Sequence, residues 1–133
     1  MILVREHGRG WESGPVKDNV DIYSRSLISL GFGGVAFSER IFCVKGRDME
    51  IPAAESLYLT TYNPELAELF HIGKEIHCYH NEIDCVELIR YYLERPEAAE
   101  AIGRAGRQRC LQEHTWSDRL KFLLQWMGVV EES

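Results

Sequence analysis

Residues 45–61 of the chain read KGRDMEIPAAESLYLTT, and this stretch decides the fold. Its second half contains a short apolar run that predicts a buried strand over Ser56–Thr60. Its first half is charged and predicts a short helix over Arg47–Glu55, in which Pro52 would be tolerated only in the first turn. Charged residues directly before a buried strand can stabilise the fold alone, or they can also bind a ligand. The sequence on both sides of this stretch helps to decide between these two explanations.

Short apolar runs on either side of this stretch predict further strands. A strand begins at the start of Leu3–Trp11, which then passes into a glycine-rich loop. A second strand is predicted over Leu27–Leu30 and another over Glu75–Tyr79. Residues 35–44 fit either a strand or a helix. Each run is brief and continuous, as expected for parallel strands that are buried on both faces.

Helical patterns separate these strands. The spacing of apolar residues predicts a helix over Val16–Ser26, and Pro64 begins a short helix in the position that proline favours. Asn81 is suited to cap the next helix, because its side chain can accept a hydrogen bond from a free backbone N–H. That helix carries four apolar residues on one face: Ile83, Val86, Ile89 and Leu93.

Two further helices follow. Pro96 starts the first, and Thr115 with Asp118 resembles a capping box for the second. The last helix holds four apolar residues: Leu120, Leu123, Leu124 and Met127. The alternation of strands and helices predicts an α/β fold over residues 1–133, as a single domain with a parallel sheet of about four strands between layers of helices.

The composition is that of an ordinary folded protein of 133 residues, with 45% hydrophobic and 27% charged residues. The net charge of −6 argues against a general nucleic-acid-binding protein, because such binding depends on neutralising phosphates with basic residues. No apolar run approaches the roughly 20 residues of a membrane-spanning helix. The four cysteines form no CxxC pair, which indicates reduced thiols and a cytoplasmic protein.

Ligands of open parallel sheets bind at the carboxyl ends of the strands. Three loops leave such ends here, at Gly31–Gly34, Thr60–Pro64 and His80–Asn81. Gly33 and Gly34 would let the backbone approach a phosphate closely, although a simple turn explains the same glycines.

The charged residues of the 45–50 segment lead into the middle of the sheet and can reach the same edge. Arg47 can neutralise a diphosphate through a bidentate contact, and Lys45 can do so as a point charge. Glu50 can accept hydrogen bonds from both hydroxyls of a ribose, since a carboxylate has two acceptor oxygens. The alternative is a solvated charged turn whose residues form local ion pairs.

Histidines and cysteines raise the question of a metal site or a nucleophile. Their spacing matches no common zinc pattern, which favours packing or surface roles for His71, His77, Cys78, His80 and Cys85. No Ser-His-Asp or Cys-His arrangement follows from the order of the residues, so we assign neither a metal ligand nor a catalytic residue.

Several longer stretches resemble one protein family. The run VKGRDMEIPAAESLYLTTYNPELAELFHIGKE (residues 44–75) resembles the C-terminal domain of GT-B glycosyltransferases and is closest to the spore-maturation (CgeB-like) branch of the group 1 glycosyltransferases. The run DCVELIRYYLERPEAAEAIGRAGRQRCLQEHTW (residues 84–116) is similar to the end of that domain. GRGWES (residues 8–13) and YSRSLISLGFGG (residues 23–34) resemble the part just upstream. The resemblance spans about residues 5–128.

This resemblance implies a Rossmann-like three-layer domain, the C-terminal half of a GT-B fold, which binds a nucleotide-diphosphate sugar as its substrate and uses no cofactor. Glu50 matches the glutamate that binds the ribose of the donor, and the turn with Thr61 and Tyr62 should lie near the donor. Two positions depart from the family pattern: Phe42 stands where retaining members carry a second glutamate, and Glu55 where glycine is usual.

Two functions are consistent with the sequence. The first is the donor-binding half of a glycosyltransferase, which orients a nucleotide sugar for transfer to an unknown acceptor. On this interpretation we expect the N-terminal acceptor half to be absent from the chain and the chain to be inactive alone. The second is a non-catalytic interaction module that keeps the fold and self-associates, and exposed apolar surface would favour it.

Overall fold

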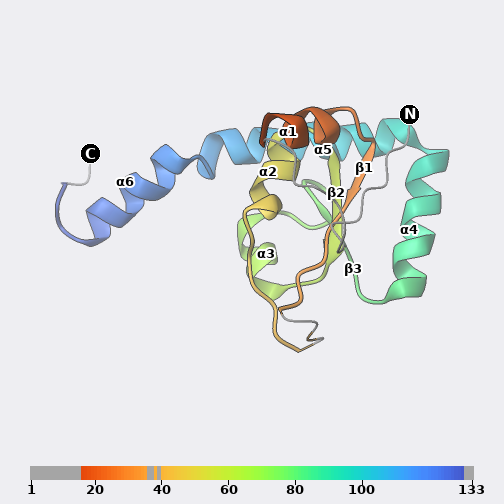
Figure 1. Ribbon diagram of the computed structural model, residues 1–133, viewed down its shortest axis with the longest axis horizontal. Helices are drawn as coiled ribbons and strands as arrows, with labels where there is room; N and C mark the ends of the chain where they lie inside the picture. Colours follow the sequence, from red (N-terminus) through yellow and green to blue (C-terminus); the bar gives the residue numbers. More distant parts are fainter. Residues whose placement is uncertain (1–15, 36–37, 39, 131–133) are drawn as a thin grey trace.

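The computed structural model describes residues 16–35, 38 and 40–130 (Figure 1). Strands alternate with helices through the first part of the chain, and only helices follow the last strand. The elements are α1 (Val16–Ser24), β1 (Ile28–Leu30), α2 (Arg47–Ala53), β2 (Leu57–Thr61), α3 (Pro64–Leu69), β3 (His77–Tyr79), α4 (Glu82–Glu94), α5 (Pro96–Glu113) and α6 (Trp116–Trp126). This order confirms the α/β class that the sequence predicts.

The three strands of the described residues form one parallel sheet in the order β1-β2-β3. Ile28 of β1 lies opposite Leu57 of β2, and Leu59 of β2 lies opposite His77 of β3. The parallel sheet is therefore as predicted, with three strands where the sequence indicates about four. The additional strand, predicted in the first part of Leu3–Trp11, lies outside the described residues.

The central strand β2 is buried on both faces. Its first four residues are almost inaccessible to solvent. Because side chains alternate between the faces of a strand, Leu57 and Leu59 point to one helical layer and Tyr58 to the other. Burial on both sides explains why this strand reads as a continuous apolar run in the sequence.

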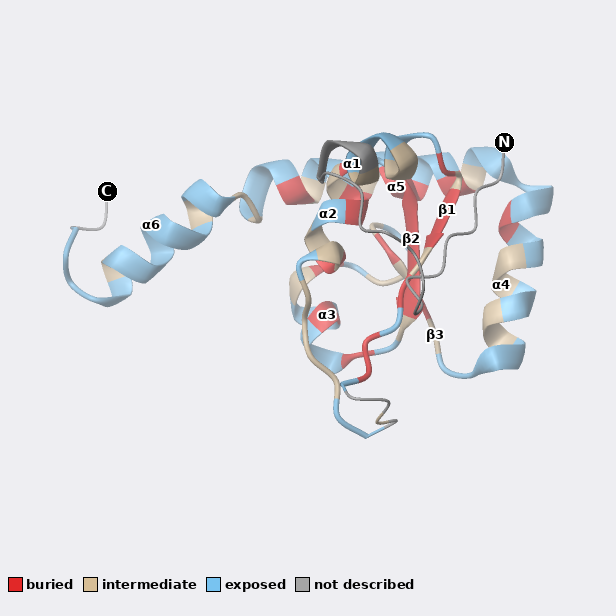
Figure 2. Cartoon of the chain, in the orientation of Figure 1, coloured by how far each residue is buried: buried red, intermediate tan, exposed pale blue. Residues whose placement is uncertain are grey.

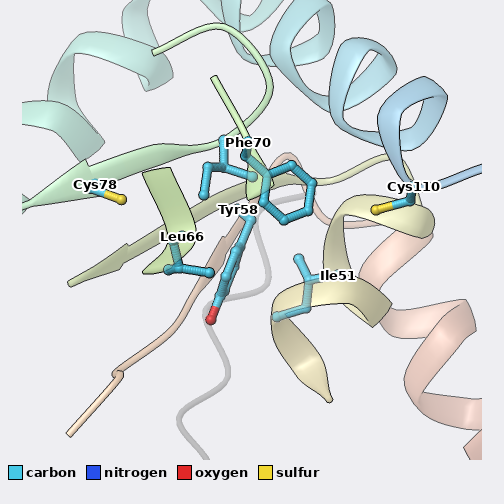
Figure 3. Close-up of a cluster of buried hydrophobic side chains, with 7 residues drawn as sticks. Ile51, Tyr58, Leu66, Phe70, Cys78 and Cys110 are labelled. Carbon is cyan, nitrogen blue, oxygen red and sulfur yellow. The ribbon is translucent and has the colours of Figure 1, made fainter. Parts of the chain in front are cut away.

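One helical layer packs α2 and α3 against the Tyr58 face of the sheet. Strands that are added in one direction place their connecting helices on the same side. Figure 3 shows Ile51 of α2 and Leu66 of α3 beside Tyr58, with Phe70 and Cys110 in the same cluster. Burying an apolar side chain of this size stabilises a fold by about 1.5–3 kcal/mol.

The opposite face of the sheet is covered by α4 and the first half of α5. Tyr92 of α4 packs with Leu57 and Leu59, and Ala99 and Ile102 of α5 join the same cluster. The buried residues in Figure 2 accordingly concentrate in the strands and in the helix faces turned toward them. The sheet lies between two helical layers, which is the three-layer, Rossmann-like arrangement expected.

The outward face of α4 carries part of the apolar stripe seen in the sequence. Ile83 is 74% exposed, and Val86 and Leu93 are exposed as well. The helix turns Tyr92 inward instead, where its hydroxyl lies 2.6 Å from Nδ1 of His77. An aromatic side chain can bury roughly 150–250 Å², and Tyr92 also has a hydrogen-bond partner, so together with Cys85, Leu88 and Ile89 it helps to set the face that packs.

The helix ends follow the predicted caps, with one difference. Asn81 accepts a hydrogen bond from the N–H of Asp84, and Thr115 and Asp118 form the predicted capping box. Pro52, however, lies in the second turn of α2, so the prediction that it would be tolerated only in the first turn is wrong.

The last helix, α6, continues beyond α5 and projects away from the sheet (Figure 1). It buries none of its residues. Within the ranges that the structure describes, no helix combines the length and the apolar character needed to cross a membrane.

Candidate functional site

Hydrogen bonds tie the three strand ends together at the carboxyl edge of the sheet. The N–H of Gly33 donates to Oγ1 of Thr61 at 2.8 Å, which joins the turn after β1 to the end of β2. The hydroxyl of Tyr79 donates to the carbonyl of Gly31 at 2.8 Å, which joins the same turn to β3. The structure thus brings the predicted site residues Gly33 and Thr61 into contact, and Gly34 follows in the same turn.

Two cations next to α2 hold this glycine turn. The ammonium of Lys45 donates to the carbonyl of Gly34 at 2.8 Å and to that of Phe32 at 3.2 Å. The guanidinium of Arg47 also donates to the carbonyl of Phe32. Neither cation forms an ion pair with a carboxylate of the described chain. Their charges meet only carbonyl dipoles, so both cations keep the capacity to bind an anion.

The charge of the neighbouring Asp48 suggests a residue that faces solvent or a ligand, but its role is structural. It is buried, and its carboxylate accepts hydrogen bonds from the backbone N–H of Lys45 at 2.6 Å and from the hydroxyl of Tyr58 at 2.5 Å. Burial of Tyr58 and the charge of Asp48 raise the pKa of this hydroxyl well above its ordinary value. Asp48 therefore anchors the charged segment to the central strand and is not available to a ligand.

Glu50 is exposed in the first turn of α2 and stays free of partners. Its carboxylate makes neither a hydrogen bond nor an ion pair with the described residues. Oε1 of Glu50 lies 3.4 Å from the place that a Cβ on Gly46 would take, so the side chain folds back toward the start of the helix. Arg47 and Lys45 contact the glycine turn from this same end of α2. All three charged residues therefore lie at the start of the helix.

The turn after β2 adds an aromatic pair and a buried amide to the same edge. The exposed ring of Tyr62 lies 5.1 Å from the ring of His80, centroid to centroid. Asn63 is 3% exposed; its Oδ1 accepts the N–H of Glu65, whereas its Nδ2 has no partner among the described residues. Nε of Arg47 is likewise buried without a partner. Such donors are commonly satisfied by a bound water or ligand.

The sequence places Asn63 only within the loop Thr60–Pro64 that leaves a strand end, without a role of its own. Its position before Pro64, which opens α3, is the signal that marks it as a helix cap. No pattern in the sequence shows that its second polar atom is left without a partner, because that depends on how the turn packs.

The histidine and the cysteine of β3, His77 and Cys78, serve packing. Burial lowers the pKa of His77, against an opposing effect of the charge of Asp84. Burial, with a smaller contribution from the charge of Asp48, raises the pKa of Cys78 to about 12, so this thiol is protonated at neutral pH. No group of His, Cys, Asp or Glu in the described part of the chain is arranged to hold a metal ion.

A hollow of about 730 Å³ lies at the opposite edge of the sheet, around the amino ends of β1 and β2. Its three arginines already have partners: Arg25 pairs with Asp21, Arg104 with Glu100 and Arg107 with Glu55. The lining residues are Ser24, Arg25, Ser26, Leu27, Ala54, Glu55, Pro96, Glu100, Arg104 and Arg107. With its cations neutralised, this hollow offers less to an anion than the carboxyl edge does.

Comparison with known protein families gives one match. The family described as glycosyl transferase-like matches residues 2–125, which is nearly the whole chain. No curated protein and no solved structure matches the chain. The match confirms the resemblance to glycosyltransferases that residues 44–75 and 84–116 indicate, while the GT-B and CgeB-like assignments stay predictions.

Proposed function

The chain belongs to the glycosyl transferase-like family, and on this premise we propose that the carboxyl edge of its sheet binds the nucleoside-diphosphate part of a sugar donor. One observation carries the proposal. Lys45 and Arg47 lie beside the glycine turn without carboxylate partners, and the free carboxylate of Glu50 lies at the same end of α2. The two cations would neutralise the charge of a diphosphate, and the carboxylate would accept hydrogen bonds from the hydroxyls of a ribose.

The cations suit the diphosphate because they now contact neutral acceptors. A phosphate oxygen is a charged acceptor, and a charge-assisted hydrogen bond is roughly twice as strong as a neutral one. Arg47 and Lys45 would therefore exchange the carbonyls of Phe32 and Gly34 for phosphate oxygens when a donor binds. The same two charges would stabilise the nucleoside diphosphate as it leaves the sugar.

Glu50 suits the ribose because both of its oxygens are free to accept hydrogen bonds from the 2′- and 3′-hydroxyls. Asp48 is excluded from this role, since its two oxygens are occupied by Lys45 and Tyr58. Tyr62, directly after β2, offers an exposed ring to the donor. We assign no nucleophile or base, and the part of this chain in glycosyl transfer is to bind and orient the donor.

Calorimetric titration with UDP, GDP and ADP tests the proposal directly. Hydrogen bonds to a charged group contribute about 1.5–3 kcal/mol, so Glu50→Gln should weaken the best of these ligands by about 10- to 100-fold. Glu87→Gln is the matched control, because Glu87 is also exposed but lies on α4, away from this edge. Equal weakening by both variants would refute the role of Glu50.

The ribose contact can be isolated with a 2′-deoxy form of the same nucleotide. If Glu50 accepts from the diol, removing the 2′-hydroxyl should weaken binding to the native chain and weaken it much less in the Glu50→Gln variant. Independent, additive losses would show that the carboxylate acts elsewhere. If no nucleoside diphosphate binds at millimolar concentration, the donor-binding interpretation fails and the interaction-module alternative is favoured.

A further inference from the structure

The side chain of Tyr79 crosses the central strand at the carboxyl edge of the sheet. Tyr79 is the last residue of β3, and its hydroxyl donates at 2.8 Å to the carbonyl of Gly31, which directly follows β1. The strands lie in the order β1-β2-β3, and neighbouring strands are about 4.8 Å apart, so the two outer strands are roughly 10 Å apart. This hydrogen bond is therefore additional to the backbone ladder of the sheet and joins its two outer strands.

The ring of Tyr79 is anchored away from the candidate site. It packs against the hydrophobic cluster on the α4 face of the sheet, which contains Leu59 and Tyr92. Burial raises the pKa of Tyr79 to about 12, and the positive charge of Arg47 opposes this rise. The hydroxyl is therefore protonated at neutral pH and donates to Gly31 from a side chain whose ring is already held.

Gly31 itself is held at three points. Its N–H donates to the carbonyl of Leu59 at 2.8 Å, and its carbonyl accepts from Tyr79. A Cβ at this position would overlap the hydroxyl of Tyr58, so only glycine lets the backbone lie this close to that ring. The start of the glycine turn therefore has a position that β2 and β3 determine together.

The carbonyl of Gly31 and the N–H of Phe32 belong to one peptide group. The described chain contains no cis peptide bond, and in a planar trans peptide the carbonyl and the N–H point in opposite directions. Because Tyr79 holds the carbonyl of Gly31, it also fixes the N–H of Phe32, which points away from Tyr79. This N–H has no hydrogen-bond partner among the described residues, and a free N–H in such a turn can bind an anion.

Two cations lie one peptide group further along the turn. Lys45 and Arg47 both donate to the carbonyl of Phe32, and Nε of Arg47 is buried without a partner among the described residues. A phosphate that binds these cations can displace the carbonyl of Phe32. The preceding peptide group does not depend on the cations, because Tyr79 holds it through Gly31.

We propose that Tyr79 is a positioning residue of this site, whose hydroxyl directs the N–H of Phe32 at a phosphate of the donor. Tyr79 itself does not touch the ligand and acts through the peptide group between Gly31 and Phe32. The inference rests on the proposed function, since it names the backbone group that adds to the phosphate contacts of Lys45 and Arg47. Tyr79→Phe keeps the ring but frees the carbonyl of Gly31, so the N–H of Phe32 loses its fixed direction.

Calorimetric titration of the whole chain with two ligands separates this role from that of Glu50. The ligands are inorganic pyrophosphate, which has the diphosphate without the ribose, and whichever of UDP, GDP and ADP binds best. Tyr79→Phe should weaken both ligands by about 10-fold, which corresponds to the loss of one hydrogen bond of ordinary strength. Glu50→Gln should weaken the nucleotide and leave pyrophosphate binding unchanged.

Tyr92→Phe is the matched control for a purely structural role. It also removes one tyrosine hydroxyl from the α4 face of the sheet, where that hydroxyl lies 2.6 Å from Nδ1 of His77 at the other end of β3. Both variants should lower the Tm by a similar small amount, and only Tyr79→Phe should weaken pyrophosphate. If Tyr79 served the fold alone, the two variants would bind pyrophosphate equally well.

A second measurement needs no substitution. In proton–nitrogen NMR spectra of the native chain, the amide proton of Phe32 should move downfield when pyrophosphate saturates the site, because it gains a charged acceptor. The same amide should move much less in Tyr79→Phe at saturating pyrophosphate.

The outcomes distinguish this inference from the function on which it rests. If the native chain binds a nucleoside diphosphate, but Tyr79→Phe binds pyrophosphate as tightly as Tyr92→Phe does, or the Phe32 amide does not respond, the positioning role is refuted and the donor site stands. If the native chain binds neither a nucleoside diphosphate nor pyrophosphate, the proposed function fails and the role of Tyr79 fails with it.

Discussion

Replacing Gly103 by alanine should destabilise the protein, although the same change in an isolated helix would stabilise it. Gly103 lies in the middle of α5, where an alanine normally stabilises a helix by about 0.8–1.0 kcal/mol. Here a Cβ on Gly103 would lie 2.4 Å from the carbonyl oxygen of Glu55 and 3.3 Å from the carbonyl carbon of Ser56. The close approach of α5 to the residues that lead into β2 therefore requires the absence of a side chain.

The size of the effect follows from these distances. To reach the 3.4 Å of an ordinary contact, α5 and the backbone of Glu55 must separate by about 1 Å. Glu55 yields poorly, because its φ of 67° already places it in the left-handed region. Overpacking of this kind typically costs 1–3 kcal/mol, and contact with backbone puts this site near the upper end. After the helix gain is subtracted, we expect a net loss of about 2 kcal/mol.

Urea unfolding followed by circular dichroism measures this change, and calorimetry should show a Tm lowered by roughly 5–10 °C. Gln108→Ala is the matched control, because Gln108 is exposed on the same helix and its replacement should change the free energy of unfolding by less than about 0.5 kcal/mol. If Gly103→Ala raised the Tm, α5 would not lie this close to the start of β2, and the packing of the second helical layer would be refuted.

Two further outcomes test buried and partly buried polar interactions that hold the fold. Tyr58→Phe should lower the free energy of unfolding by about 1.5–3 kcal/mol in urea titrations, because the buried carboxylate of Asp48 would lose one of its two hydrogen-bond donors; a loss below 0.5 kcal/mol would contradict the anchoring role. For Glu75, burial alone would raise the pKa, but hydrogen bonds from Arg109 and from the backbone of His71 lower it below the ordinary value. Its contribution to stability is therefore present above the unfolded-state pKa and is lost as the pH falls through the lower folded-state pKa. Stability measured from pH 6 down to pH 3 should fall less steeply in Glu75→Gln than in the native chain, and identical slopes would refute the linkage.

The regular elements of the fold are predictable from local sequence, because short-range chemistry fixes them. The apolar run ending in Thr61, the amide of Asn81 and the Thr115–Asp118 pair each mark an element boundary through groups within a few residues. The face of α4 that packs is not fixed in this way. It depends on contacts between different elements, such as the one between Tyr92 of α4 and His77 of β3.

In the candidate site, too, some features follow from neighbouring residues in the sequence, and others depend on contacts between separate elements. The residue types that suggest a site can be recognised from the sequence, and the structure places Gly33 against Thr61 and the cations Lys45 and Arg47 beside the same turn. That these residues bind a donor stays a prediction. The burial of Asp48 could not be predicted, because an aspartate three residues after Lys45 reads as one more solvated charge. Asp48 can be buried because the hydroxyl of Tyr58, on a separate element, donates a hydrogen bond to its carboxylate.

The charges before the central strand therefore divide into three roles, and this division has a consequence for binding. Asp48 fixes the segment to β2, Lys45 and Arg47 bind the carbonyls of the glycine turn, and Glu50 remains free. A diphosphate that competes for all the donors of these two cations would release those carbonyls. The turn would then still be held by the bond from Gly33 to Thr61, by Tyr79, and by the backbone hydrogen bonds from Gly31 to Leu59 and from Cys43 to Gly33. Because Asp48 keeps the backbone at Lys45 in place, donor binding should rearrange the glycine turn and leave the start of α2 where it is.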